Sequence, residues 1–268
     1  MRRLIIRPGG IGDCILSLPA IEQLRADSTE VWVPSAVVPL IRFAPALAIS
    51  STGIDLLGLP GVEPPARLIA RLCEFDSIVS WYGSNRGEFR GHVRELRLPF
   101  EFLPALPEAR SKMHAADFFL RQVGGQGDAV PRICCEREPG EDFAVIHPFS
   151  GSPRKNWPLD RFQELAARLA LPVRWCAGPE ETLAGADRFD DLYELACWLA
   201  RARFYIGNDS GITHLAAAVG TPVAAIFGPT DPAVWAPRGP RVTVIGSGRL
   251  DEIEVDRVLA AAREIVAS

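Results

Sequence analysis

The chain has 268 residues, of which 48% are hydrophobic, so it can bury one large core or two smaller ones. Its 29 basic and 33 acidic side chains give a net charge of −4, which does not favour a nucleic-acid partner. No run approaches the roughly 18 apolar residues of a membrane span, and glycines interrupt the basic start "MRRLIIRPGG" too early for a signal peptide. The six cysteines form no C-x-x-C pair or zinc spacing, so we expect reduced thiols in a cytoplasmic protein.

Strand-like and helix-like segments alternate along the first half, which is typical of α/β proteins with parallel sheets. Short apolar runs predict strands, and apolar residues at helical spacing predict helices. The predicted strands are residues 3–7, 30–33 and 77–81, and the predicted helices are 14–26, 66–74 and 113–123. Residues 124–142 are rich in glycine, proline and charge, so we expect a linker there.

The alternation restarts after this linker. The predicted strands are residues 143–149, 172–178, 203–209 and 222–228, and the predicted helices are 159–170, 191–202, 211–220 and 254–267. The sequence therefore predicts two doubly wound α/β domains, residues 1–138 and residues 139–268.

The first glycine-rich turn, "RPGGIGD", follows the first predicted strand. It lacks the G-x-x-x-x-G-K-[ST] pattern, and Ile15 stands where a dinucleotide fingerprint needs the third glycine after Gly10 and Gly12. A pyrophosphate is therefore not expected on this helix, and the acid Asp13 would oppose one. Asp13 either carries chemistry or stabilises the helix start as an ordinary capping residue.

The second turn, "IGNDSGITHL", combines small polar residues with the start of a helix. Free backbone amides at such a helix start form a natural anion site, to which Ser210 can add a hydroxyl and His214 a ring nitrogen. The alternative is that Asp209 or Ser210 is an ordinary N-cap and that His214 is a packed helix residue.

A third polar loop, "HPFSGSPRKNW", carries Ser150 and Lys155 after a strand, and "CAGPEE" places Glu180 and Glu181 after the next one. Lysine binds phosphate as a compact charge, and a carboxylate can accept from ribose hydroxyls. Loops at the carboxyl ends of strands are where α/β sheets bind ligands, although most such side chains are simply solvated.

These motifs occur together in a fixed order. "IIRPGGIGDCILSLPAIEQLR", "SIVSWYGSNRGEF", "IHPFSGSPRKNWPLDRFQEL" and "YIGNDSGITHLAAAVGTPVAAIFGPTDPAVWAP" resemble the motifs of glycosyltransferase family 9, the heptosyltransferases of lipopolysaccharide core synthesis. The resemblance implies a GT-B fold, with an acceptor domain, a donor domain and a cleft between them. It also implies that the last helix can pack back on the N-terminal domain.

The resemblance further implies an inverting, metal-independent transfer in which Asp13 is the general base and Lys155 meets the charge of the leaving diphosphate. There is no D-x-D motif for a metal, so no cofactor or metal is expected. The implied donor-binding residues are Ser150, Gly151, Lys155, Glu180 (or its neighbour Glu181), Asp209, Ser210, Gly211 and His214. The implied acceptor-side residues are Gly10, Gly12, Asn85 and Arg86, with Arg90 and Arg94 one helical turn apart either as a basic stripe or as a solvated face.

The expected partners are a nucleotide-sugar donor, most simply ADP-heptose, and a glycan or lipid-linked acceptor, with no nucleic acid. A lipid-linked acceptor implies peripheral contact with the inner face of the cytoplasmic membrane. The segment "TLAGADRF" is shorter than in typical family members, and this shortening leaves open a non-catalytic sugar-nucleotide-binding remnant. A second alternative is a GT-B sugar-nucleotide epimerase or hydrolase.

Overall fold

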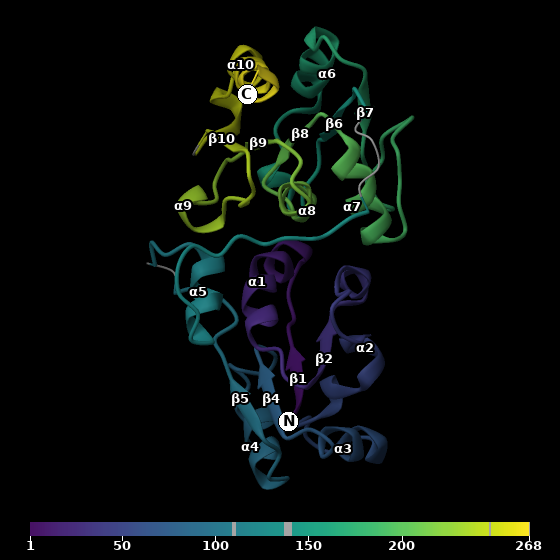
Figure 1. Cartoon of the computed structure of the whole chain (residues 1–268), viewed down its shortest axis with the longest axis vertical. Helices are drawn as coiled ribbons and strands as arrows, with labels where there is room; N and C mark the ends of the chain where they lie inside the picture. Colours follow the sequence, from purple (N-terminus) through teal and green to yellow (C-terminus); the bar gives the residue numbers. More distant parts are fainter. Residues whose placement is uncertain (109–110, 137–140, 247, 268) are drawn as a thin grey trace.

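The structure is a computed structural model that describes residues 1–108, 111–136, 141–246 and 248–267. It contains two units, each built on a parallel sheet, and Figure 1 shows them stacked along the long axis of the molecule. The fold class predicted from the sequence, two doubly wound α/β domains, is confirmed. The predicted boundary after residue 138 falls among residues 137–140, which lie outside the described residues.

The N-terminal unit contains the following elements. Its strands are β1 (Arg2–Ile6), β2 (Ser28–Val33), β3 (Ala46–Ala48), β4 (Ser77–Ser80) and β5 (Phe100–Phe102). Its helices are α1 (Ile11–Gln23), α2 (Ile49–Thr52), α3 (Ala66–Leu72), α4 (Gly87–Glu95) and α5 (Ala115–Gln122), with 3₁₀ turns η1 (Ser35–Leu40) and η2 (Ile54–Leu56).

The C-terminal unit repeats this plan. Its strands are β6 (Ala144–His147), β7 (Val173–Trp175), β8 (Phe204–Asn208), β9 (Val223–Ile226) and β10 (Val242–Ile245). Its helices are α6 (Leu159–Arg168), α7 (Leu192–Arg201), α8 (Gly211–Ala218), α9 (Pro232–Trp235) and α10 (Val255–Ala267), with 3₁₀ turns η3 (Pro153–Lys155) and η4 (Leu250–Glu252).

The strand orders locate the ligand-binding edges. The first sheet runs β3-β2-β1-β4-β5 and the second β10-β9-β8-β6-β7, with every pairing parallel. The order reverses between β1 and β4 in the first sheet and between β6 and β8 in the second. Ligands of open α/β sheets bind at such switch points, beyond the carboxyl ends of the strands. The turns after β1, β6 and β8 are therefore placed for binding.

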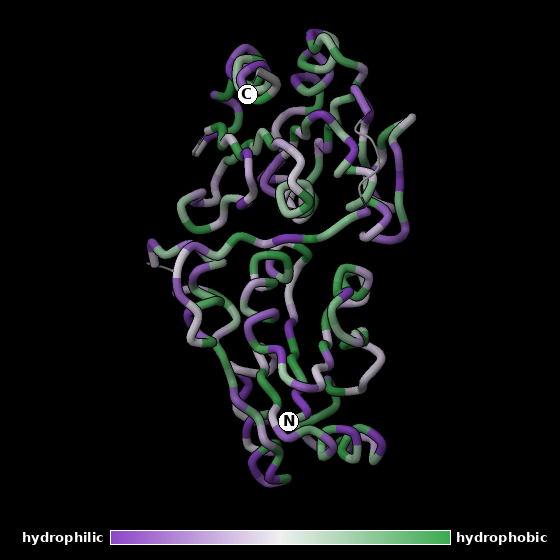
Figure 2. The backbone as a smooth tube through the Cα atoms, viewed as in Figure 1, coloured by the Kyte–Doolittle hydropathy of each residue, from purple (hydrophilic) through white to green (hydrophobic). Residues whose placement is uncertain are grey.

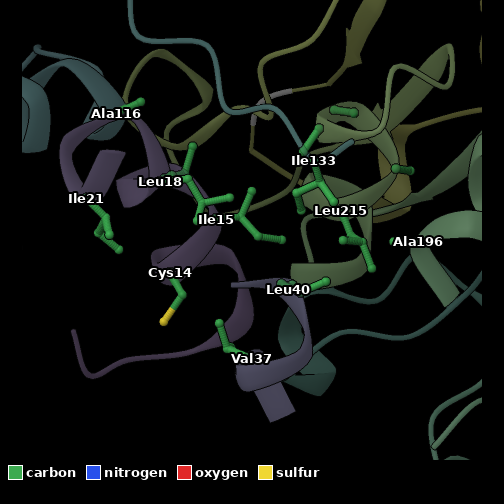
Figure 3. Close-up of a cluster of buried hydrophobic side chains, with 14 of the residues drawn as sticks. Cys14, Ile15, Leu18, Ile21, Val37, Leu40, Ala116, Ile133, Ala196 and Leu215 are labelled. Atoms are coloured by element: carbon green, nitrogen blue, oxygen red, sulfur yellow. The ribbon is translucent and has the colours of Figure 1, made fainter. Parts of the chain in front are cut away.

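The two units share a buried apolar cluster, part of which is drawn in Figure 3. Ile15 and Leu18 of α1 lie in it with Leu215 of α8 and Ile133 of the linker, and all four are less than a tenth exposed. Each fully buried side chain of this size contributes about 1.5–3 kcal/mol relative to an exposed one. The cluster holds α1 and α8 together without using any polar group of the site.

The linker is confirmed as irregular, because residues 125–136 form no helix or strand. It runs between the two units (Figure 1). The Ile133 N–H donates to the Ala218 carbonyl at 3.0 Å, and the Ala129 N–H donates to Asp117 at 2.8 Å. The linker is therefore attached to both units.

The expectation that the last helix packs back on the N-terminal domain is wrong for the described residues. The buried face of α10, which includes Val258 and Ala262, lies in the second cluster with Phe162 of α6 and Ile226 of β9. This face covers the outer side of the C-terminal sheet, which would otherwise expose its apolar residues.

The sequence pattern does not predict the three short strands β3, β5 and β10 or the helices α2, α4 and α9. Each of the three strands lies at an edge of its sheet and has only three or four residues, too few for a clear periodicity. Helix α4 was only a conditional expectation, and Figure 2 shows it as mostly hydrophilic. Among the described residues, no helix is both long enough and apolar enough to cross a bilayer.

Candidate active site

The β1–α1 turn places Asp13 at the edge of the N-terminal sheet. The helix begins at Ile11, three residues earlier than predicted, because Gly10 serves as its N-cap and Asp13 turns back to accept the Gly10 N–H at 2.9 Å. Gly9 has φ +118°, and a Cβ there would lie 3.0 Å from the Asp13 carboxylate oxygen. Only glycine fits this approach, so the turn holds the carboxylate close to its own backbone.

Arg7 lies beneath this turn and is 1% exposed. Its guanidinium donates to the Ser17 hydroxyl at 3.0 Å and to the Asp13 carbonyl at 3.2 Å, and it lies 4.3 Å from the Phe119 ring centroid. Burial lowers the pKa of Arg7 from its usual value. Arg7 therefore fixes the backbone of the turn rather than the Asp13 carboxylate.

The β8–α8 turn is held by a buried network. Ser210 is the N-cap and accepts the Thr213 N–H, and the Thr213 hydroxyl contacts both the Tyr205 hydroxyl, at 3.0 Å, and the Asn208 carbonyl. The Asn208 amide side chain also donates to the Pro148 carbonyl at 2.8 Å. The side chains of Asn208, Ser210 and Thr213 are thus satisfied internally. Helix geometry leaves the amides of the first turn, such as that of Gly211, without intrahelical acceptors.

Lys155 and Asp209 connect this turn to η3. Their ammonium and carboxylate groups lie 2.7 Å apart, with the Lys155 side chain 34% and the Asp209 side chain 7% exposed. The pair joins residues 54 positions apart in the sequence. It places one cation beside the N-terminus of α8, where an anion would also be stabilised by the helix dipole.

Ser150 shapes the loop between β6 and η3. Its hydroxyl contacts the Ser152 carbonyl at 2.8 Å and the Asn156 side-chain oxygen at 2.7 Å. A Cβ on Gly151 would have no neighbour within 4 Å, so this glycine faces open space. The loop thus leaves room beside Lys155 for a ligand.

Of the two adjacent glutamates, the structure brings Glu181 into the site and not Glu180. Glu180 is exposed and lies outside the cavity lining, whereas Glu181 lines the cavity and accepts from the Gly178 N–H at 2.6 Å and contacts His147 Nε2 at 3.0 Å. Burial acts to raise the pKa of Glu181, but the hydrogen bonds from His147 and Gly178 outweigh it and lower the pKa. Sequence alone could not choose between neighbours, because the turn after β7 decides which one faces inward.

The two helix starts meet across the boundary between the units. A Cβ on Gly12 would lie 2.9 Å from His214 Cδ2, and a Cβ on Gly211 would lie 2.7 Å from the Ile11 Cβ. His214 is 6% exposed, and burial lowers its pKa to about 4. The imidazole is therefore neutral at physiological pH.

Beside these helix starts lies a cavity of about 750 Å³. Its lining includes the glycines Gly10, Gly12, Gly151, Gly178 and Gly211 and the polar residues Asp13, His147, Ser150, Ser152, Lys155, Glu181, Asp190, Asp209, Ser210, His214 and Thr230. The cavity is within the usual size range of ligand sites, and the structure gathers Asp13 from one unit and Lys155 from the other around it.

Asn85 and Arg86 do not line this cavity. Asn85 lies at a second cavity of about 400 Å³, with Arg90 and Leu106. Arg86 donates to the Tyr82 hydroxyl at 3.0 Å. The neighbouring Phe100 and Phe102 rings pack on Phe89, with centroids 6.0 Å away, so they belong to the core rather than to an exposed apolar surface.

Sequence reasoning missed several lining residues, namely Phe189, Asp190, Leu192, Leu195, Thr230 and Trp235. Phe189 ends the shortened segment "TLAGADRF", Asp190 follows it, and Trp235 belongs to the one-turn helix α9. No motif singled them out, although "GPTDPAVW" was part of the recognised pattern. Among the described residues, no group of three or more His, Cys, Asp or Glu side chains is arranged to hold a metal ion.

The comparisons with known sequences all identify heptosyltransferases as similar to this chain. Residues 125–261 match the profile of glycosyltransferase family 9 (heptosyltransferase). Lipopolysaccharide heptosyltransferase 1 of Salmonella typhimurium is 32% identical over 295 aligned residues, covering 87% of this chain and 90% of that protein. Lipooligosaccharide heptosyltransferase 2 of Haemophilus influenzae is 35% identical over 335 aligned residues, covering 98% and 93%.

Solved structures share the fold at lower identity. A family 9 glycosyltransferase from Veillonella parvula superposes with a TM-score of 0.77 at 19% identity, over 99% of this chain and 97% of that one. The ADP-heptose lps heptosyltransferase II of E. coli gives a TM-score of 0.74 at 18% identity, over 100% and 99%. The two-unit architecture is thus GT-B, and the chain belongs to glycosyltransferase family 9 and is a glycosyltransferase.

Proposed function

We propose that the enzyme transfers heptose from ADP-heptose to a lipopolysaccharide-core-like acceptor, with inversion at the anomeric carbon. The relatives named above are heptosyltransferases, and one neighbour in structure is described as an ADP-heptose enzyme. One observation carries the proposal. The Asp13 carboxylate lies at the same cavity as the N-terminus of α8 and the Lys155 ammonium beside it.

In this proposal Asp13 is the general base. Its Oδ2 is held by the Gly10 N–H, so the carboxylate keeps its orientation while it accepts the proton of the acceptor hydroxyl. As the acceptor hydroxyl loses this proton, its oxygen attacks the anomeric carbon. The bond from that carbon to the diphosphate breaks at the same time, through an oxocarbenium-like transition state. A positioned base of this kind contributes about 10²–10⁴-fold to the rate.

The leaving diphosphate would sit at the start of α8. The amides of Gly211 and Ile212, the helix dipole and the Lys155 ammonium together supply positive charge where negative charge develops. These groups can do without a metal what a bound cation does in other transferases. Metal independence is supported by this donor set and by the absence of a D-x-D motif from the sequence.

The acceptor would approach from the side of α1, where Gly10 and Gly12 leave the backbone uncovered. A lipid-linked acceptor would bring the protein to the inner face of the cytoplasmic membrane as a peripheral visitor. Arg86, Arg90 and Asn85 lie away from the Asp13 cavity, so in this proposal they contact a distal part of the acceptor.

The test begins with metal-free protein in EDTA. Calorimetric titration with ADP, UDP, GDP and CDP should show a preference for ADP, and ADP-heptose should then be turned over in the presence of a lipopolysaccharide-core acceptor. NMR of the product should show an inverted anomeric centre. A strict requirement for magnesium would refute metal independence. Preference for another nucleotide would refute ADP-heptose as the donor. Tight ADP binding without turnover would favour a non-catalytic remnant.

A further inference from the structure

The segment that follows α9 joins the C-terminal unit to α5 of the N-terminal unit. The Ala236 carbonyl lies 2.8 Å from His114 Nε2, and the Arg238 guanidinium donates to both carboxylate oxygens of Asp117, at 2.6 and 2.7 Å. His114 is 8% exposed and the Asp117 side chain 13%, so both contacts are largely shielded from water. We call these two contacts the α5 clasp.

His114 makes two different hydrogen bonds in this clasp. Its Nδ1 accepts the Ala116 N–H at 3.2 Å and so caps α5, which means that Nδ1 carries no proton. Nε2 therefore carries the proton of the neutral ring and donates it to the Ala236 carbonyl. Burial lowers the pKa of His114, which favours this neutral form. Capping alone needs only the first bond, so the second serves the contact between the units.

On the N-terminal side, the clasp leads to the turn that holds Asp13. Phe119 of α5 is fully buried, and its ring centroid lies 4.3 Å from the Arg7 guanidinium, which in turn donates to the Asp13 carbonyl at 3.2 Å. Helix α5 also packs along α1, and Figure 3 shows Ala116 beside that helix. A displacement of α5 would therefore displace the Asp13 turn.

On the C-terminal side, the clasp leads to the donor end of the cavity. Trp235, directly before Ala236, lines the cavity. A Cβ on Gly239 would lie 2.5 Å from the Ala217 carbonyl oxygen, so the segment just after Arg238 lies tightly against α8. The start of α8 lines the same cavity. The clasp thus connects α8, through α5, to the carboxylate on the opposite side of the site.

The clasp differs from a third contact between the units. Lys112 and Asp231 lie 3.4 Å apart, but the Lys112 side chain is 85% exposed, and exposed ion pairs contribute little. The Arg238–Asp117 pair is bidentate and partly buried, which fixes direction as well as distance. The alignment of the two units on this side therefore depends on the clasp rather than on surface charge.

We propose that His114 and Arg238 are positioning residues for the transfer, which through the clasp hold α5, and with it Asp13, aligned with the donor-binding end of α8. This inference rests on the proposed role of Asp13. Neither residue lines the cavity, so neither touches the donor. Loosening the clasp should lower kcat, because Asp13 loses its alignment, while the ADP-binding groups of the C-terminal unit keep their affinity.

Two substitutions of His114 separate the clasp from the helix cap. His114→Asn keeps an oxygen that can accept the Ala116 N–H but cannot reach the Ala236 carbonyl. His114→Gln can place an amide N–H near the position of Nε2 but is a poor cap. We expect kcat of the Asn variant to fall by about 10- to 100-fold, as for a small displacement of reacting groups, and the Gln variant to keep most of its kcat. A cap role alone predicts the reverse order.

The measurements are steady-state transfer from ADP-heptose and calorimetric titration with ADP, with thermal unfolding as the check that each full-length variant is folded. The Kd for ADP should stay within about twofold of wild type in both variants, since only a group that acts in the transition state is displaced. A wild-type kcat in folded His114→Asn would overturn the inference, and so would a Kd that rises as far as kcat falls.

The second contact offers an independent test with a matched control. Arg238→Met removes the bidentate pair, while Asp117 still accepts the Ala129 N–H at 2.8 Å. It should lower kcat without changing the Kd for ADP, and Arg241→Met, at an exposed position of the same segment, should change neither. Equal kcat in the two variants would overturn the role of Arg238. A wild type that transfers no heptose would overturn the proposed function and this inference together.

Discussion

The turns that begin α1 and α8 occupy corresponding places in their sheets but satisfy their first amides in different ways. At α1 the N-cap is Gly10, which has no side chain, so the carboxylate of Asp13 returns to it. At α8 the Ser210 hydroxyl caps the helix and a buried network surrounds it. The first turn therefore leaves a carboxylate at the cavity, whereas the second leaves backbone amides beside a lysine.

This difference also explains how two positive helix ends can face each other. Helix N-termini carry partial positive charge, so two of them at close range repel. Asp13 on one side and Asp209 on the other bring negative charge between them, and the apolar cluster around Ile15 and Leu215 holds the helices in place. A diphosphate bound at α8 would reduce the repulsion further.

The largest effect is expected at the α1 turn. Asp13→Asn keeps the size and the acceptor for the Gly10 N–H but removes the base, so kcat should fall by about 10²–10⁴-fold. ADP affinity should stay within a few-fold of wild type, because the donor side is untouched. Asp55→Asn, at an exposed position in η2, is the control. Unchanged kcat in Asp13→Asn would refute the general-base role.

The next largest effect is expected at Lys155, the cation of η3 that lies beside the α8 turn. The chain has two lysines, Lys155 at the cavity and Lys112, whose side chain is 85% exposed. Lys155→Ala leaves the buried Asp209 carboxylate unpaired at an anion site, so the Kd for ADP should rise by about 10–100-fold. Lys112→Ala should leave the Kd unchanged in the same titration. Equal effects of the two substitutions would mean that net charge, not position, governs binding.

The helix contact should also make stability depend on pH. Burial lowers the pKa of His214 from 6.5 to about 4, so the unfolded chain takes up this proton first on acidification. The contribution of the neutral His214 ring to the free energy of unfolding is fully present above about pH 6.5. It is lost between about pH 6.5 and pH 4, by roughly 2–3 kcal/mol.

Urea unfolding across this range measures the loss, and His214→Gln should show a shallower decline than wild type. His114, whose pKa burial also lowers, remains in both proteins, so His214→Gln should keep part of the decline. Parallel pH curves for the two proteins would show that His214 does not titrate differently in the folded state.

The smallest effect concerns the close approach of the two turns. Gly12→Ala and Gly211→Ala place a Cβ within 3 Å of the opposite unit, so each should lower the free energy of unfolding by about 1–3 kcal/mol. Gly91→Ala, in α4 with open space around it, should instead raise it by about 0.5–1 kcal/mol. Thermal or urea unfolding distinguishes the signs, and a stabilising Gly12→Ala would mean that the units are farther apart in solution.

Much of the site could be predicted because its parts are local. The strand–turn–helix patterns and the polar loops after strands single out Asp13, Lys155, Ser210, Gly211 and His214, and the family resemblance adds their expected roles. The choice of Glu181 over Glu180 could not be predicted, since it depends on how the short segment after β7 folds back towards His147. The resemblance groups Asn85 and Arg86 with the acceptor side, but neither lines the Asp13 cavity, and Asn85 lies at a separate one.

The sequence by itself determined the two α/β halves, the irregular linker and the capped helix starts, because these depend on residue periodicity and on hydrogen bonds within a few residues. Only the tertiary structure decided that α1 and α8 meet, that Lys155 pairs with Asp209 and that α10 covers the C-terminal sheet. The physical reason is the distance along the sequence between the residues that interact. Capping and strand formation are satisfied locally, whereas these contacts depend on how distant apolar surfaces pack together.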